Sequence, residues 1–317
     1  MSRRGSRPSS AATRDLWRVR AGQWVLFALA VGFHRLTRPL GVWTLAGLIA
    51  PLGGRLAQVV PSWRRRVADN LDLVRPDGDH ARRETLIRST GAAFTRLMVE
   101  YAHLDRFLDR LEIAVEGLEH VTGPIKEGRG VVLVSAHFGN WEAIRAATRR
   151  VGVDCGIFYR AFNNRYLDRH AQSLIAQVGQ PVLQKGAKGL RGLIAHVSRG
   201  GAVLILVDQR STGAPLIPFL DHPAQTTTSV AQIAQRTGAA LVPAVAFRNT
   251  GQRRFEVRFE PEITPCDPNA AMAEVNAAIG RWILSDPPQW FWFQRRWRRV
   301  ARWSAGSHDG STRVRPG

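Results

Sequence analysis

A repeated pattern in the second half of the chain, a short apolar run followed by a segment with helical spacing, constrains the fold most. Three of the apolar runs cover residues 128–136, 153–161 and 201–209. The first and third runs are rich in branched aliphatic residues, and a segment with helical spacing of apolar residues follows each of the three. Alternation of strands and helices predicts an α/β fold, in which helices flank a mostly parallel central sheet.

Further elements extend this pattern to residue 284. Helices are predicted at 140–150, 164–179, 190–200, 226–238 and 268–284, and further strands at 181–185, 240–248 and 254–263. The last strand alternates apolar and polar residues, which favours an edge or antiparallel position. Thr226, Thr227 and Thr228 are interpreted as a cap of the helix that follows. Earlier in the chain, helical spacing recurs between residues 79 and 111.

Two apolar stretches, 23–33 and 39–54, lie near the N-terminus. Neither supplies the roughly 20 consecutive apolar residues that a spanning helix needs. A cleaved secretory signal is one interpretation, since residues 28–30 resemble a cleavage site, and a buried core helix is another. Arginines flank the two stretches, and they favour an uncleaved anchor at an anionic headgroup layer. These are Arg14, Arg18 and Arg20 on one side and Arg64, Arg65 and Arg66 on the other.

The organisation predicted from these features has four parts. Residues 1–13 are expected to be disordered, residues 14–62 to associate with a membrane, and residues 301–317 to form a disordered tail. The α/β domain occupies residues 63–300.

Composition limits the classes of partner. The formal net charge is +20, and nearly all the positive charge is arginine, because the lysines are Lys126, Lys185 and Lys188. A guanidinium group suits phosphate and carboxylate, so nucleic acid, anionic membranes, phosphorylated lipids and acidic proteins are the candidate partners. Cys155 and Cys266 form no metal-ligand pattern. We therefore predict no metal site and two buried free thiols in a reducing compartment.

Polar residues follow three of the predicted strands. His137, Arg160 and Asp208 each lie at or just beyond the carboxyl end of one of them. In open α/β sheets ligands collect along that edge, so we expect these side chains to converge in one cleft.

The segment SAHFGNWE (135–142) supplies the candidate catalytic pair. If its loop turns back, Glu142 can hold one imidazole nitrogen of His137 while the other nitrogen takes a proton from an alcohol. Gly139 permits an unusual backbone angle or a close approach of substrate, and we predict that it and Asn140 contribute to substrate binding. The alternative is a structural histidine with an unrelated surface glutamate.

The HFGNWE motif resembles the H-x-x-x-x-D/E signature of glycerolipid-type acyltransferases. As an ordered set, several blocks resemble more narrowly the lipid A biosynthesis lauroyl/myristoyl acyltransferase family. These blocks are WRRRVADNL (63–71), YRAFNNRYLDR (159–169), residues 207–248 and PPQWFWFQRRWRR (287–299). Three positions depart from the family pattern: Gln294 stands where relatives often have histidine, and residues 208–210 and 218–221 also differ.

The resemblance covers roughly residues 20–300 and implies an activity. An acyl carrier protein or coenzyme A thioester would donate a fatty acyl group to a glycolipid hydroxyl, such as that of a lipid A precursor, at the cytoplasmic face of an inner membrane. His137 would be the general base and Glu142 its orienting partner, with no cofactor. Arg160 would bind a phosphate of the donor or acceptor, and Asp208 would hold Arg160 or the acceptor sugar. Acidic acyl carrier protein and anionic lipids both suit the basic surface.

Other interpretations remain. The same resemblance fits an acyltransferase that acts on a phosphatidylinositol mannoside or a lysophospholipid. A nucleic-acid-binding protein would explain the charge, but no known binding module occurs, and we predict no nucleic-acid partner. A hydrolase could use the same pair, although no G-x-S-x-G motif is present. A non-catalytic membrane scaffold is a further alternative.

The aromatic and basic run Trp290–Arg299 fits either a membrane interface or a helix that packs its aromatics inward.

Overall fold

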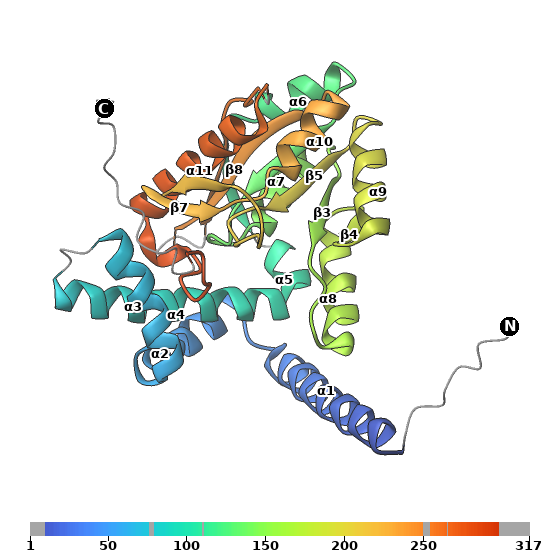
Figure 1. Cartoon of the computed structure of the whole chain (residues 1–317). Coiled ribbons are helices and arrows are strands. Elements are labelled where there is room, and N and C mark those ends of the chain that lie inside the picture. The colour runs from blue at the N-terminus through green and yellow to red at the C-terminus, as the bar shows by residue number, and fades with distance from the viewer. Residues whose placement is uncertain (1–9, 76–78, 110, 250–253, 265, 298–317) are drawn as a thin grey trace, which may run out of the picture.

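A seven-stranded sheet forms the centre of the computed structural model, which describes residues 10–75, 79–109, 111–249, 254–264 and 266–297 (Figure 1). The strand order is β1-β9-β8-β2-β5-β3-β4. Neighbouring strands are parallel, except that β8 and β9 are antiparallel. The predicted fold class, α/β with a mostly parallel central sheet, is therefore confirmed. The strands are β1 (Glu112–Glu116), β2 (Val131–Ser135), β3 (Cys155–Tyr159), β4 (Val182–Gln184), β5 (Ala202–Leu206), β8 (Ala240–Asn249) and β9 (Arg254–Phe259).

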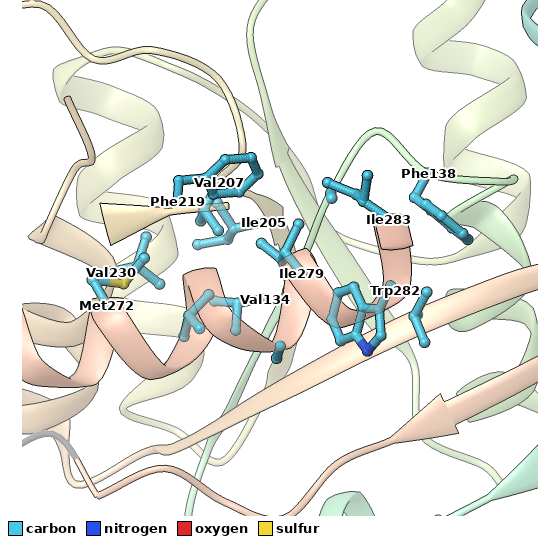
Figure 2. Packing of buried hydrophobic residues seen from close by; sticks show 14 of the residues in the cluster. Val134, Phe138, Ile205, Val207, Phe219, Val230, Met272, Ile279, Trp282 and Ile283 are labelled. Carbon is cyan, nitrogen blue, oxygen red and sulfur yellow. The ribbon is translucent and has the colours of Figure 1, made fainter. Parts of the chain in front are cut away.

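Helices cover both faces of this sheet, because alternate strand residues point to opposite sides. Val132 and Val134 of β2 pack into one core with side chains of α9, α10 and α11, whereas Val131 and Leu133 pack into another with α7 and α8. Figure 2 shows the first core, in which α11 lies against the sheet. The helices are α6 (Glu119–Lys126), α7 (Glu142–Arg150), α8 (Arg165–Val178), α9 (Ala187–Val197), α10 (Ser229–Thr237) and α11 (Pro268–Ser285).

Two parts of the sheet architecture differ from the simplest expectation. The alternating strand β9 was predicted to be an edge or an antiparallel strand. It is antiparallel to β8 but parallel to β1, and it lies inside the sheet because β1 forms the edge beside it. A separate hairpin of β6 (Leu216–Phe219) and β7 (His222–Gln225) was not predicted. Leu220 and Asp221 form its turn with φ of 49° and 62°, the left-handed geometry that matches the twist of a hairpin.

Among the described residues, five helices precede β1. They are α1 (Ser10–Thr37), α2 (Val42–Val59), α3 (Pro61–Val74), α4 (His80–Ala102) and α5 (Leu104–Asp109). In Figure 1, α1 projects from the body and α2 lies against α4. Within the described part of the chain, no helix combines the length and apolar character needed to cross a membrane. The disorder predicted for residues 1–13 and 301–317 falls mainly or wholly outside the described residues.

Small residues hold α2 closely against α4. A Cβ atom on Gly53 would lie 1.7 Å from Oγ1 of Thr95, and one on Gly91 would lie 2.5 Å from the Cβ of Ala57. Distances this short exclude a larger side chain at either glycine, and close backbone approach leaves little freedom for the two helices to slide. The contact therefore fixes α4, which matters for the site because α4 also borders it.

The prediction of two buried free thiols is confirmed for one of the two cysteines. Both are free, and Cys155 is buried in β3, but Cys266 is exposed because it lies in the loop before α11. Burial raises the pKa of the Cys155 thiol to about 12, so it is protonated and unreactive at neutral pH.

Candidate active site

The carboxyl ends of β2 and β5 bring His137 and Asp208 together. Ser135 of β2 and Leu206 of β5 are partners in the parallel register. His137 lies two positions after Ser135, and Asp208 lies two positions after Leu206. The Nδ1 atom of His137 is 2.7 Å from Oδ1 of Asp208, and the backbone N–H of His137 donates to Oδ2 at 3.0 Å. The predicted convergence at this sheet edge is thus observed for these two residues.

Asp208 is fully buried and accepts further hydrogen bonds from the C-terminal segment, the part of the chain that follows α11 from residue 286 on. Trp290 Nε1 donates to its Oδ2 at 2.8 Å, and Gln294 Nε2 donates to the same oxygen at 3.0 Å. Burial alone would raise the pKa of Asp208, but the charge of His137 and the hydrogen bonds from His137, Trp290 and Gln294 outweigh it and lower the pKa to about 2. Asp208 is therefore an ionised carboxylate at neutral pH.

The ionised carboxylate determines which imidazole nitrogen carries the proton. Because this carboxylate can only accept hydrogen bonds, Nδ1 of His137 must be the donor, and in the neutral ring Nε2 then carries the lone pair. The His137 side chain is 22% exposed. Its Nε2 lies 3.4 Å from Nε2 of the exposed Gln209, and the Trp141 ring packs edge-on at a centroid distance of 5.2 Å. Such a pair can accept a proton from a hydroxyl group at Nε2.

Glu142 has a different setting from the predicted one. Glu142 is the first residue of α7, and its side chain is fully buried. The carboxylate accepts hydrogen bonds from Arg145 Nη1 at 2.5 Å and from the Tyr101 hydroxyl at 2.7 Å. The prediction that Glu142 orients His137 is wrong for this structure, because the carboxylate on the imidazole belongs to Asp208. Glu142 instead neutralises Arg145, whose guanidinium bonds the carbonyls of Cys155, Ile175 and Gly179.

The predicted role of Asp208 as a partner of Arg160 also differs from the structure. Among the described residues the Asp208 carboxylate is bonded to His137, Trp290 and Gln294. Arg160 is exposed beyond the end of β3 and lies 3.5 Å from Oδ1 of Asn163. Its guanidinium is therefore accessible to an anion, and the predicted phosphate contact stays a prediction.

Gly139 and Asn140 shape the loop that carries His137. Gly139 has a φ of +55°, and a Cβ there would lie 2.1 Å from the Ala246 carbonyl oxygen, so the requirement for glycine comes from packing against β8. Asn140 is fully buried; its Nδ2 donates to Glu100 and its Oδ1 accepts from the backbone N–H of Glu142. Both polar ends are used within the protein, so a loop-holding role fits Asn140 better than the predicted substrate contact.

A pocket opens beside the imidazole. Apolar side chains from α4 and the C-terminal segment form most of its walls, and Arg248 and His137 also line it. The residues that line it include Phe94, Leu97, His137, Arg248, Pro288 and Phe291. Among the described residues, no group of three or more His, Cys, Asp or Glu side chains is placed to hold a metal ion.

The C-terminal segment contributes more to the site than the sequence pattern indicated. Trp290 and Trp292 are 1% and 2% exposed, so the described part of the aromatic run packs inward. The backbone N–H of Phe291 donates to the carbonyl of His137, and the N–H of Gly139 donates to the carbonyl of Gln289. No local signal identified these contacts, because they join residues about 150 positions apart in the sequence. Of the three threonines interpreted as a cap, Thr228 is the N-cap residue of α10, whereas Thr226 accepts from the buried Arg296.

Comparison with known proteins decides the family. A sequence model described as bacterial lipid A biosynthesis acyltransferase matches residues 13–299. This chain belongs to that family. The match covers every strand of the sheet, the His137–Asp208 pair and most of the C-terminal segment, and it confirms the resemblance found from the sequence.

Individual relatives support the assignment to the lipid A acyltransferase family. The chain is 27% identical over 262 residues to the lipid A biosynthesis palmitoleoyltransferase of Escherichia coli K12, a match that covers 78% of this chain and 84% of the relative. It is 26% identical over 260 residues to the lauroyltransferase of the same organism, with 77% and 82% coverage. It is also 26% identical over 207 residues to a phosphatidylinositol mannoside acyltransferase of Mycobacterium tuberculosis, with 63% coverage of each. The chain is therefore an acyltransferase of lipid metabolism.

Proposed function

We propose that this acyltransferase moves a fatty acyl chain from an acyl carrier protein or coenzyme A thioester to a hydroxyl of a lipid A precursor, with His137 as general base. The observation that carries the proposal is the 2.7 Å contact between His137 Nδ1 and the buried, ionised Asp208, where His137 lines a largely apolar pocket. The contact fixes the tautomer in which Nε2 can take a proton.

The proposed reaction needs no covalent acyl-enzyme. Nε2 of His137 removes the proton of the acceptor hydroxyl while the oxygen attacks the thioester carbonyl, which forms a C–O bond and a tetrahedral oxyanion. Collapse of the oxyanion breaks the C–S bond, and the imidazolium returns its proton to the departing thiolate. During these steps Asp208 stabilises the imidazolium and stays ionised, as its lowered pKa of about 2 requires. The proposal involves no metal or organic cofactor.

The lining of the pocket suits the apolar carbon atoms next to a thioester. Phe94 and Leu97 of α4 and Phe291 of the C-terminal segment give it apolar walls, and His137 lies among them. Packing of those carbon atoms against the apolar walls would leave the thioester carbonyl near the imidazole, because His137 lines the same pocket.

We further propose that the protein works at the cytoplasmic face of the inner membrane. The support is apolar surface on the first two helices: Trp24, Leu26 and Leu29 of α1 are 55%, 60% and 65% exposed, and Leu48 and Leu52 of α2 are 70% and 58% exposed. Exposed apolar side chains on helices with flanking arginines suit insertion into the headgroup layer. The basic surface would also attract an acidic acyl carrier protein and the anionic acceptor lipid.

Lipid analysis of cells tests the proposal most directly. A strain that lacks the gene is complemented with wild type, His137→Ala or a vector, and its lipids are compared by mass spectrometry. We expect the His137→Ala strain to lose the same acyl mass from lipid A as the vector strain, while the variant protein stays in the membrane fraction. Restoration of the acyl mass by His137→Ala would refute the general-base role, and a loss confined to another lipid would refute the acceptor.

A phosphatidylinositol mannoside is the second candidate acceptor. The observation that favours it is the 26% identity over 207 residues to the mycobacterial acyltransferase, close to the identities with the lipid A enzymes. The same lipid analysis separates the two, since only one of the two lipid classes should lose acyl mass in the deletion strain.

A further inference from the structure

Two consecutive residues of α4, Glu100 and Tyr101, contact the loop that carries His137. Glu100 is fully buried, and its Oε2 accepts from Asn140 Nδ2 at 3.0 Å. The hydroxyl of Tyr101 donates to Oε1 of Glu142 at 2.7 Å. Asn140 and Glu142 stand on either side of Trp141, so α4 holds the loop at two points three and five residues beyond the imidazole.

The carboxylate of Glu100 is itself fixed. Arg248 of β8 binds both of its oxygens, with Nη2 at 2.7 Å from Oε2, and the Arg248 side chain is 4% exposed. A buried carboxylate with a bidentate guanidinium partner has a defined orientation, because either charge left alone would be costly. Arg248 is held in turn at its backbone, where its N–H donates to Gln289 Oε1 at 2.8 Å.

These contacts converge on the position of the imidazole from three sides. The C-terminal segment bonds the backbone of His137 and Gly139, Asp208 bonds the imidazole, and α4 bonds the far end of the loop. The α4 contact is anchored on a rigid element, because Gly91 and its neighbours pack α4 tightly against α2. The same helix forms one wall of the pocket through Phe94 and Leu97.

We propose that Glu100 and Tyr101 form a clamp that sets the position of the His137 loop relative to the pocket wall, so that Glu100 is a positioning residue for acyl transfer. The proposal rests on the proposed function. It assigns Glu142 a place in the same clamp rather than on the imidazole. Reaction of a thioester held in the pocket requires the base at a defined distance, and a displacement of about 1 Å can cost about 100-fold in rate.

Glu100→Gln and Tyr101→Phe test the clamp in the full-length protein in detergent micelles. Glu262→Gln is the control for loss of an ion pair away from the site: Glu262 binds an arginine through both oxygens, at 2.9 and 2.7 Å. Glu262 is 31% exposed, and its partner Arg129 precedes β2 at the opposite end from His137. Transfer is followed as thiol release from a lauroyl thioester in the presence of a lipid A precursor. All rates are measured at a temperature at which circular dichroism shows each variant fully folded.

A positioning role predicts a change in kcat beyond any loss of folded protein. We expect Glu100→Gln to lower kcat about tenfold or more while KM changes less than about threefold, and Tyr101→Phe to have a smaller effect in the same direction. Glu262→Gln should retain wild-type kcat. The Nδ1 proton of His137, observed by NMR in protein with ¹⁵N-labelled histidine, should broaden in Glu100→Gln and stay sharp in the control.

The outcomes separate this proposal from the proposed function. A fully folded Glu100→Gln variant with wild-type kcat and a sharp imidazole signal overturns the clamp, even if His137 is the base. If Glu100→Gln does not fold, Tyr101→Phe decides, because it leaves the ion pair with Arg248 intact; wild-type kcat and signal there also overturn the clamp. Full activity of His137→Ala would instead refute the general base, and the NMR signal would still report on the clamp.

Discussion

Replacing Asp208 with asparagine isolates the charge that holds His137. The substitution keeps the size of the side chain and offers one carbonyl oxygen to the imidazole Nδ1–H. Its amide N–H₂ group, however, cannot accept the hydrogen bonds that the second carboxylate oxygen accepts. Those bonds come from the backbone N–H of His137 and from the side chains of Trp290 and Gln294. Asp208→Asn therefore perturbs both the tautomer of His137 and the attachment of the C-terminal segment.

The size of the stability effect follows from the lowered pKa of Asp208. The pKa falls from its ordinary value of 3.8 to about 2 on folding, which corresponds to about 2 kcal/mol of stability at neutral pH. Because the folded-state pKa lies below the unfolded one, this stabilisation is complete above about pH 4 and disappears as the pH falls toward 2. Asp208→Asn should thus be less stable than wild type at pH 7, and the difference should shrink in acid.

Urea unfolding at several pH values, in one detergent and at one protein concentration, measures this difference. Acyl transfer at neutral pH is measured on folded protein, where loss of the orienting carboxylate should lower kcat by about 100-fold or more. A stability difference that is constant between pH 7 and pH 3 would refute the assignment of the effect to the Asp208 charge. Near-normal kcat in a folded variant would refute its role in orienting the imidazole.

Three further predictions follow from the same structure. Glu142→Gln should destabilise the protein by about 3 kcal/mol, since it leaves buried Arg145 without a counter-ion, yet it should lower the kcat of folded enzyme less than Asp208→Asn does. Thermal unfolding and transfer rates check this, and a larger loss of kcat in Glu142→Gln than in Asp208→Asn would indicate that Glu142 orients the imidazole. Gly139→Ala should lower both stability and kcat, because its Cβ would meet the Ala246 carbonyl at 2.1 Å; a variant with wild-type melting behaviour would contradict the observed loop geometry. Raising ionic strength should increase KM for an acyl-carrier-protein donor, because the net charge is +20, and a KM independent of salt would argue against electrostatic attraction.

Six of the seven strands of the central sheet could be predicted because their signal is local, whereas the edge strand β1 was not predicted. Apolar runs such as Val131–Ser135 are fully buried in a parallel sheet, and the helices between them carry their own periodicity, so strand and helix positions agree closely with the expected ones. The hairpin of β6 and β7 was missed because its strands contain Pro218 and Pro223 and are only four residues long.

The sequence by itself determined that His137 and Asp208 follow buried strands, and the family blocks determined the class of reaction. Only the tertiary structure decided which carboxylate holds the imidazole. Glu142 is near His137 in the chain, but it begins a helix and is bound there by Arg145 and Tyr101. Asp208 is far away in the chain, yet the register that pairs Ser135 with Leu206 places it within hydrogen-bonding distance. Register and side-chain pairing depend on packing among distant segments, and for that reason a local motif cannot specify them.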